Sequence, residues 1–550
     1  MRTLTSLTSH VPGQETGGRT WRVRCLTLTT TATLVGALFL YAPSATSSMT
    51  PTGSANRGQA ATPGLVPSAG TVNGLAPAVR RAPTAGELAY ARTESARRPL
   101  AGPARLTAKV TEPAAGISSP AVRPPGSRAA AAPVIFRNSS VQTSGVTSTV
   151  SEPSTDQLNA DIFQTSNWTA QFSHSSGTSW TSLNPFTIFG SGFCCDQVTV
   201  RDTRRARQLW LLQYGDHLTL ASSATTNLAT WCTYRLTPQA ILGRPAGENF
   251  DYNDLAIGNS FLYLTSNLFS SSGFTGTALI RFNLDNLSAC QATGFSQIVR
   301  TNLFTLKVAQ GTTSVAFAAS TNLDTGTGNT LRILTWPENS NFITTTNKAI
   351  AAFSYMSNNS GQSCASSDGV VNNWCQRTDS RILGAARGDG KVRFSFNVKQ
   401  GSSNRPFPYT RMETFRESDL ALLTNQDLFG MTVAHLYASM APDALGRIGY
   451  IDSFGGGTGS AHFFPGALIG IVDSQAPDFP GSTSFFLFGS GGGCLNAADG
   501  LRRWGDYNTA RGGGTAAGTW TATSWARTTS ADVGCSTATP ITMSNVLFGR

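Results

Sequence analysis

Acidic side chains recur near the starts of short apolar runs, and their type and position indicate which reactions the chain could catalyse. Asp251 and Asp254 lie in the run FDYNDLAIG, and Asp506 lies in RRWGDY. Two carboxylates on different strands can act as acid and base in glycoside cleavage, and their separation then decides between retention and inversion. If the protein is an enzyme, Asp251, Asp254 and Asp506 are therefore the catalytic candidates.

The same positions also carry side chains suited to binding without catalysis. Aromatic rings can stack on sugar faces because they combine an apolar surface with tolerance of polar rims; the candidates are Tyr252, Tyr507, Trp504 and Phe407. Arg381 could clamp an anion or a hydroxyl group. We expect His435 to be a satisfied interior or rim side chain, since no second histidine lies near it in the repeat order. The predicted ligand-binding set is Asp196, Gln197, Asp251, Tyr252, Arg381, His435, Asp506 and Tyr507.

Three acidic residues at predicted strand starts raise the question of a metal ion. Asp196, Asp251 and Asp506 offer the oxygen ligands that a hard cation such as Ca²⁺ prefers. The structural alternative is that each aspartate accepts backbone N–H bonds in a turn, a role consistent with its repetition along the chain. We predict no cofactor and keep Ca²⁺ as the alternative; zinc is disfavoured, because paired C-x-x-C spacing and a histidine cluster are missing.

A repeated unit positions these side chains. Each of six segments has a polar residue, a short apolar strand, a turn and a second strand; the polar residues are Asp196, Asp251, Lys307, Arg381, His435 and Asp506, with Asp379 beside the fourth. Repeats of roughly 50 to 70 residues with about four strands each are typical of β-propellers. Innermost strands begin near the central channel, so these residues should converge at one mouth.

We therefore predict an all-β fold with one six-bladed β-propeller across residues 150–550, in which a chain end donates a strand to complete one blade. Seven blades and two stacked β-sandwiches are the alternatives, because strands and turns alone do not fix topology.

One segment resembles a motif of a known family. The stretch SHSSGTSW is similar to the Asp-box of bacterial neuraminidase-type repeats, S-x-D-x-G-x-T-W: Ser173, Gly177 and Trp180 match, Ser179 replaces the Thr, and Ser175 replaces the Asp. The layout from about residue 155 onward also resembles secreted sialidase-like propellers. That resemblance implies a turn between the outer strands of a blade. The resemblance does not imply an enzymatic activity, since propellers host hydrolases, lyases, lectins and scaffolds. The family's F-R-I-P stretch is also absent from this sequence.

The first 135 residues have a different character. In residues 1–45, Arg19, Arg22 and Arg24 precede the apolar run CLTLTTTATLVGALFLY and the small residues APSATSS, the order of an export signal. An uncleaved signal anchor is the alternative, because the run approaches the length needed to span a bilayer. Residues 46–135 are predicted to be a disordered Pro/Ala/Arg-rich linker, since they cannot bury enough apolar surface to offset ordering entropy. We expect an extracellular protein, secreted or attached to the surface of a bacterium.

Eight cysteines follow Cys25, and an even number behind an export signal favours disulfides. They are Cys194, Cys195, Cys232, Cys290, Cys364, Cys375, Cys494 and Cys535. The last four are paired in chain order, Cys364 with Cys375 and Cys494 with Cys535. The two adjacent cysteines can bond to each other, or separately to the next two along the chain; we expect separate bonds.

The distribution of charge along the chain limits the classes of partner that can be expected. The formal charge is +11, but residues 1–135 hold fourteen Lys/Arg and four Asp/Glu, so that +10 lies there and +1 remains for the rest. A nucleic-acid footprint on the folded part is therefore not supported, and membrane contact is expected only through an uncleaved N-terminal anchor. We predict a monomer that binds extracellular glycan or protein at the channel mouth, and we favour binding over catalysis. A glycoside hydrolase or polysaccharide lyase is the alternative.

Overall fold

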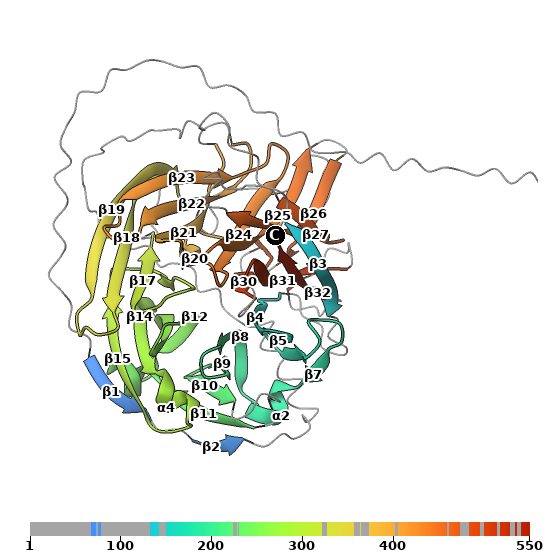
Figure 1. The fold of residues 1–550 in the computed structure, drawn as a ribbon. Coiled ribbons are helices and arrows are strands. Elements are labelled where there is room, and N and C mark those ends of the chain that lie inside the picture. Colours follow the sequence, from blue (N-terminus) through green and yellow to red (C-terminus); the bar gives the residue numbers. More distant parts are fainter. Residues whose placement is uncertain are drawn as a thin grey trace, which may run out of the picture. The chain divides into compact units, whose positions relative to one another are not determined.

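The computed structural model describes a β-propeller of seven blades, each a sheet of four antiparallel strands around a common centre (Figure 1). The residues described are 68–72, 75–78, 133–141, 150–223, 228, 230–321, 327–356, 364, 373–401, 405–458, 461–472, 483–495, 500–513, 517–528, 534–535 and 541–550. The predicted export signal, residues 1–45, and most of the predicted linker lie outside these residues.

Each blade runs outward from its first strand, as consecutive strands pair antiparallel. Blade 1 consists of β4 Ser154–Leu158, β5 Asp161–Ser166, β6 Thr169–Ser173 and β7 Thr181–Leu183. Blade 2 consists of β8 Phe193–Asp202, β9 Arg207–Tyr214, β10 Leu218–Ser223 and β11 Trp231–Leu236. Blade 3 consists of β12 Asn249–Ile257, β13 Phe261–Ser270, β14 Gly273–Asn283 and β15 Thr293–Arg300.

Blades 4 to 6 repeat the pattern. Blade 4 consists of β16 Lys307–Val308, β17 Val315–Ser320, β18 Thr327–Pro337 and β19 Thr344–Ser354. Blade 5 consists of β20 Ile382–Gly388, β21 Lys391–Val398, β22 Tyr409–Arg416 and β23 Leu422–Leu428. Blade 6 consists of β24 Ala434–Pro442, β25 Ile448–Thr458, β26 Ala461–Val472 and β27 Thr483–Leu487. A small two-stranded sheet, β28 Cys494–Leu495 with β29 Arg502–Arg503, precedes blade 7.

Blade 7 is built from both ends of the folded part. Its inner strands are β30 Thr509–Gly512, β31 Thr519–Arg527 and β32 Ile541–Gly549, and its outermost strand is β3 Val134–Val141. Pairing of β3 with β32 confirms that a chain end donates a strand to complete a blade. A buried ion pair between Glu152 and Arg503, at 2.8 Å, further ties the start of blade 1 to the segment before blade 7.

The predicted number of six blades was wrong, because blade 1 was not recognised as a unit. Its four strands occupy only residues 154–183, far fewer than the roughly 65 residues expected for a blade. The blade also lacks the polar-residue signature by which the other six were aligned. The stretch resembling an Asp-box joins β6 to β7, the third and fourth strands of this blade.

Two further strands add to blade rims. Strand β1, Ser68–Val72, pairs with β15, and β2, Leu75–Ala78, pairs with β11, so blades 2 and 3 each have five strands. Both lie inside the segment that the sequence predicts to be a disordered linker.

Three helices of one turn connect strands, and each begins with a residue that caps it: α2 Pro185–Phe189, α3 Pro238–Leu242 and α4 Leu284–Ser288. The side chains of Asn184, Thr237 and Asn283 accept hydrogen bonds from backbone N–H groups of the first turn, which satisfies donors that have no partner within a helix. No helix among the described residues is long and apolar enough to cross a membrane.

The core lies between blades, where the apolar faces of neighbouring sheets meet. The buried side chains there include Trp210, Trp374, Trp520 and Trp525. Trp504 was considered for sugar stacking, but it is 2% exposed and stacks on Trp525 with ring centroids 4.0 Å apart. It belongs to the core, where its large apolar surface stabilises the packing of blade 7.

Four disulfides are present: Cys194–Cys195, Cys232–Cys290, Cys364–Cys375 and Cys494–Cys535. The last two were predicted. The prediction of separate partners for the two adjacent cysteines was wrong, because Cys232 and Cys290 face each other at the rims of blades 2 and 3, with Cα atoms 5.8 Å apart. This set of disulfides fits an extracellular protein.

Candidate functional site

Bulges in the innermost strands turn side chains toward the centre. The register of β12 against β13 shifts between Asp251 and Asp254, and that of β24 against β25 shifts between Leu436 and Ser439. Tyr252 and Tyr437 lie within these shifts with positive φ of 55° and 64°. A bulky residue rarely adopts this conformation, and bulges often re-aim a side chain beside a functional site.

Each strained backbone is held by a side chain of the preceding blade. The N–H of Tyr252 donates to Asp196 Oδ2 at 3.2 Å, and the N–H of Tyr437 donates to Asn397 Oδ1 at 3.0 Å. These bonds satisfy the backbone N–H groups that the bulges remove from pairing between strands. Both tyrosines are therefore positioned by neighbouring blades.

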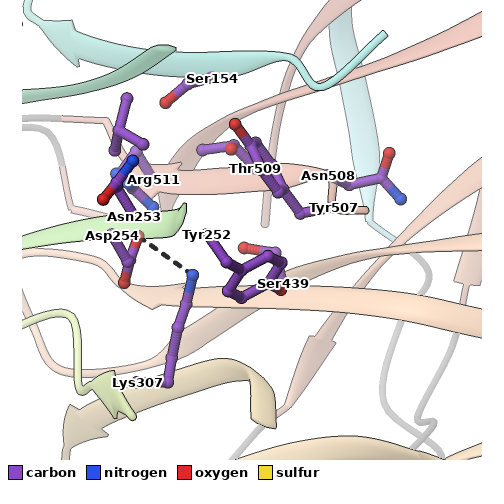
Figure 2. Close-up of a pocket in the computed structure, with 11 residues that line it drawn as sticks. Ser154, Tyr252, Asn253, Asp254, Lys307, Ser439, Tyr507, Asn508, Thr509 and Arg511 are labelled. Carbon is purple, nitrogen blue, oxygen red and sulfur yellow. Dashed lines mark ion pairs between the residues drawn. The ribbon is translucent and has the colours of Figure 1, made fainter. Parts of the chain in front are cut away.

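The first cavity lies where blades 1, 2, 3, 4, 6 and 7 meet (Figure 2). Its lining is Ser154, Val198, Tyr252, Asn253, Asp254, Lys307, Ser439, Tyr507, Asn508, Thr509 and Arg511. The space open to the centre of a water molecule is ≈ 10 Å³, which is room for about one ordered water. Side chains therefore fill most of the channel, and only a small group can enter the cavity as it stands.

The charges in this cavity belong to Asp254, Lys307 and Arg511, from three different blades. Lys307 Nζ lies 3.0 Å from Asp254 Oδ1, the contact drawn as a dashed line in Figure 2. Burial lowers the pKa of Lys307, while Asp254 opposes that shift and Arg511 adds to it. Burial also lowers the pKa of Arg511, against the attraction of Asp254 and Asp156. Two buried cations thus share one lining carboxylate.

Four polar atoms of the cavity lining have no hydrogen-bond partner among the described residues: Asn253 Oδ1, Arg511 Nε, the Tyr252 hydroxyl and Asp254 Oδ2. The last two belong to a phenol and a carboxylate, which can both bind a hydroxyl group. Tyr252 is 5% exposed, and burial raises its pKa well above the usual value, so the phenol is neutral. Unpaired buried polar atoms are unfavourable. These two atoms therefore mark the place where a water or ligand hydroxyl would be bound most favourably.

A half-buried ring faces Tyr252. Tyr507 packs edge to face on it, with centroids 6.1 Å apart and planes at 81°. The guanidinium of Arg381 lies over the Tyr252 ring, 4.2 Å from its centroid. This is a cation–π contact. Tyr252 thus links the first cavity to a second.

The second cavity is lined by Arg377, Thr378, Asp379, Arg381, Leu383, Tyr437 and Asp506. Arg381 forms two hydrogen bonds with Asp379, at 2.7 and 2.6 Å. Burial opposes the charge of Arg381, but Asp379 outweighs it and raises the pKa of Arg381 above its usual value. Asp506 lies 3.6 Å from Arg503. Both carboxylates of this cavity therefore face an arginine.

The structure brings together only part of the predicted site. Tyr252, Asp254, Lys307 and Tyr507 line the first cavity, and Asp379, Arg381 and Asp506 line the second. The other four predicted residues line neither: Asp196, Gln197, Asp251 and His435.

These four side chains make contacts within and between blades. Asp196 holds the backbone of Tyr252, as described above. Gln197 Oε1 accepts from Trp210 Nε1 at 2.8 Å, and Asp251 Oδ1 accepts from Gln213 Nε2 at 3.3 Å. His435 Nδ1 lies 3.0 Å from Asp452 Oδ2, and both side chains are buried. His435 is thus a satisfied interior residue.

The three aspartates considered for Ca²⁺ do not gather. Asp196 binds a backbone N–H, Asp251 binds an amide, and Asp506 faces an arginine. Across the part of the chain that the structure describes, no group of three or more His, Cys, Asp or Glu residues is placed to hold a metal ion.

Sequence reasoning missed several lining residues. Ser154 was missed because blade 1 was not recognised. Arg511 was not among the candidates, although a charged residue within an otherwise small, apolar first strand is a signal that could have identified it. Asn253 and Asn508 directly follow the predicted tyrosines in sequence, and each could have been included with its neighbour.

Comparisons with known proteins place this chain in no family. No family model matches it, and no curated protein does. The NanB sialidase from Streptococcus pneumoniae is 9% identical over 57% of this chain, which spans just under two thirds (66%) of that chain, with a TM-score of 0.36. The xyloglucan-locus protein GH43B from Bacteroides ovatus is 8% identical over 67% of this chain and 57% of that chain, with a TM-score of 0.30. At this level of similarity neither assigns a function.

Proposed function

We propose that this protein binds an extracellular glycan, with one hydroxyl-bearing group of the ligand held at the centre of the propeller. The observation that carries the proposal is the pair of unpartnered buried atoms, the Tyr252 hydroxyl and Asp254 Oδ2, in one cavity. Pockets usually recognise small ligands through a few convergent polar groups of this kind.

The chemistry of the lining suits a hydroxyl-rich ligand. A carboxylate accepts from a hydroxyl, Lys307 and Arg511 donate to one, and a tyrosine hydroxyl can do both. The ring of Tyr507 is half-buried beside them and offers an apolar face. Because the cavity has room for about one water, a terminal group enters while the rest of the glycan lies across the channel mouth.

Binding is favoured over hydrolysis by the placement of the carboxylates. Asp254 is the one carboxylate of the first cavity's lining, and it forms an ion pair with Lys307. Glycoside cleavage of the common type needs two carboxyl groups facing the same bond. A glycoside hydrolase or polysaccharide lyase remains the second candidate, with Asp254 and Asp506 from the two neighbouring cavities as its acids.

The same proposal includes an extracellular setting, in which the export signal or anchor and the linker present the propeller away from the cell. The four disulfides support it, since such bonds persist in oxidising compartments. A protein partner at the same mouth is the alternative ligand. Membership of a sialidase-like family stays a prediction.

A glycan array probed with the full chain, followed by a product-release assay on every hit, tests the proposal. Tyr252→Phe removes only the unpartnered hydroxyl, and Asp254→Asn removes the charge while keeping the shape. We expect each to weaken binding at least tenfold, without turnover in either form. Asp285→Asn, at a side chain that is 74% exposed, is the matched control.

Two results would overturn this reading. Product release that is lost in Asp254→Asn would show catalysis. Glycan binding that is unchanged in both Tyr252→Phe and Asp254→Asn would place the site elsewhere, and the absence of any glycan hit would direct the search to protein partners.

A further inference from the structure

The rims of blades 2 and 3 are covered by an added segment from the N-terminal side. Strand β1 runs antiparallel to β15, from Ser68 opposite Gln297 to Val72 opposite Thr293. Strand β2 runs antiparallel to β11, with Leu75 opposite Thr233 and Ala78 opposite Trp231. Figure 1 shows both strands, in blue, at the outer rim beside β15 and β11. An extended segment that adds to a sheet edge is held mainly by backbone hydrogen bonds.

One side-chain fit makes this pairing specific. Gly70 pairs with Phe295, and a Cβ atom at Gly70 would lie 2.5 Å from Phe295 Cζ, closer than carbon atoms can approach. Phe295 itself is 8% exposed. The ring thus occupies the space above a residue that has no side chain, so any larger residue at position 70 would be excluded.

The two edges are fixed relative to each other before the segment binds. The Cys232–Cys290 disulfide links β11 to the loop before β15, and the Tyr234 hydroxyl donates to the Gln291 carbonyl at 3.0 Å. A surface already held in its bound geometry loses less entropy on binding. Edge strands left open tend to pair with other chains, and here two adjacent edges share one occupant.

We propose that the paired edges of β11 and β15 form a strand-binding surface that also takes the segment Ser68–Ala78 of a second copy of this chain, giving a strand-exchanged dimer. The contacts made by a second copy's segment are the same as those made in one chain, so exchange is a low-cost route to a dimer. The segment continues to β3 through residues 79–133, whose fully extended length is at most roughly 190 Å. That length is several times the radius of gyration of roughly 21 Å expected for a compact domain of 400 residues, so the segment can reach a neighbouring molecule.

The chain's own segment competes with that of the second copy. The covalent connection gives the chain's own segment a high effective concentration at this surface. Exchange is therefore expected to rise with protein concentration, and to be strongest where many copies are gathered on one surface.

The test uses two full-length variants, Ala69→Cys and Ser296→Cys, because Ala69 and Ser296 are paired across the two strands. Equimolar mixtures are incubated from 10 µM to 1 mM, treated with a short thiol-specific cross-linker and analysed by denaturing electrophoresis. We expect a product of twice the chain mass whose yield rises with concentration. Ala69→Cys alone is the control for random cross-linking, and adding Gly70→Val to the Ala69→Cys chain should abolish the product.

A chain carrying both cysteines shows whether the pairing exists in one molecule, where it should give an internal cross-link without a change in mass. An internal cross-link with no double-mass product at any concentration would overturn the exchange. No cross-link in either format would overturn the strand-binding surface itself, and a product insensitive to Gly70→Val would overturn the fit between Gly70 and Phe295.

Discussion

The ammonium group of Lys307 lies 3.0 Å from one oxygen of Asp254, while the other oxygen of that carboxylate has no partner among the described residues. Lys307 begins β16 and Asp254 lies within β12, the innermost strands of neighbouring blades, and both side chains are largely buried, at 12% and 6% exposure. The pair therefore links two blades and also leaves one acceptor directed at the cavity.

Loss of Lys307 should destabilise the propeller. In Lys307→Met the Asp254 carboxylate stays buried without its cation, and breaking a buried pair in this way typically costs about 3 to 5 kcal/mol. Urea unfolding measures the change. The double variant Lys307→Met/Asp254→Asn should recover part of the loss, since the carboxylate is then neutral while Arg511 keeps only the attraction of Asp156. A double variant no more stable than Lys307→Met would show that packing, and not charge, is responsible.

The exposed pair Arg416 and Asp419 provides the matched control. Both side chains are about half exposed, at 53% and 52%, so solvent screens their interaction. Arg416→Met should leave the unfolding midpoint unchanged. A loss comparable with that of Lys307→Met would mean that removal of any arginine or lysine charge lowers stability.

The buried Asp452 should make stability depend on pH. Burial raises the pKa of Asp452 to about 6, although His435 and Thr410 act in the opposite direction. The folded pKa lies above that of the unfolded chain, so the protonated carboxyl stabilises the fold at low pH. This contribution is lost as pH rises from about 4 through about 6.

The variant Asp452→Asn cannot ionise. The difference in free energy of unfolding, wild type minus variant, should therefore fall by roughly 3 kcal/mol between pH 4 and pH 7. Urea unfolding at several pH values measures it. A difference that stays constant, or that grows with pH, would contradict the raised pKa.

Glu413 on β22 is a second buried acid, and its two carboxylate oxygens have no hydrogen-bond partner among the described residues. Burial raises its pKa well above the usual value, partly offset by Arg411. The folded chain then keeps a proton that the unfolded chain releases, and wild type loses about 1.4 kcal/mol of stability per pH unit above roughly pH 5. Glu413→Gln should remove this slope, so the variant gains on wild type as the pH rises above the pKa of the unfolded chain. Equal slopes in both proteins would show that Glu413 is ionised in the fold.

Two of the disulfides should differ in how much they stabilise the fold. In the chain-entropy account, a bond that closes a longer loop stabilises more. Cys232–Cys290 spans 58 positions and Cys364–Cys375 spans 11. Replacing both cysteines by alanine should therefore cost about 4 kcal/mol for the first pair and about 3 kcal/mol for the second. Urea unfolding of the two double variants gives the comparison, and the reverse order would mean that native contacts of the shorter loop outweigh entropy.

The repeat pattern allowed the fold class to be predicted, but not the number of blades. Alternating apolar residues with turn residues identify strands because side chains point to opposite faces of a sheet, and six units could be aligned in this way. Blade 1 was missed because its strands are short. The linker prediction also missed β1 and β2: a segment of small residues carries almost no apolar signal, and it is ordered here by backbone pairing with edges supplied by distant strands.

The site was predicted only where local sequence decides it. Tyr252 and Tyr507 each follow an aspartate and precede an asparagine near the start of a strand. Such patterns are visible in the sequence. Arg511 contributes to the cavity only because blade 7 closes beside blade 1. The unpartnered oxygen of Asp254 depends on which donors approach from other blades, and no periodicity in one sequence contains that information.

Pairing of Val134 with Gly549 has a consequence for how the protein comes into being. The strand that completes the last blade leaves the ribosome long before the strand it must join, so early blades can form but the circle cannot close until β32 has been made. Contacts between such distant positions form slowly. Until then the edge of β3 that will bind β32 is unpaired and can associate with other chains. Pairing of β3 with β32, and not the formation of any one blade, therefore commits the chain to its native state.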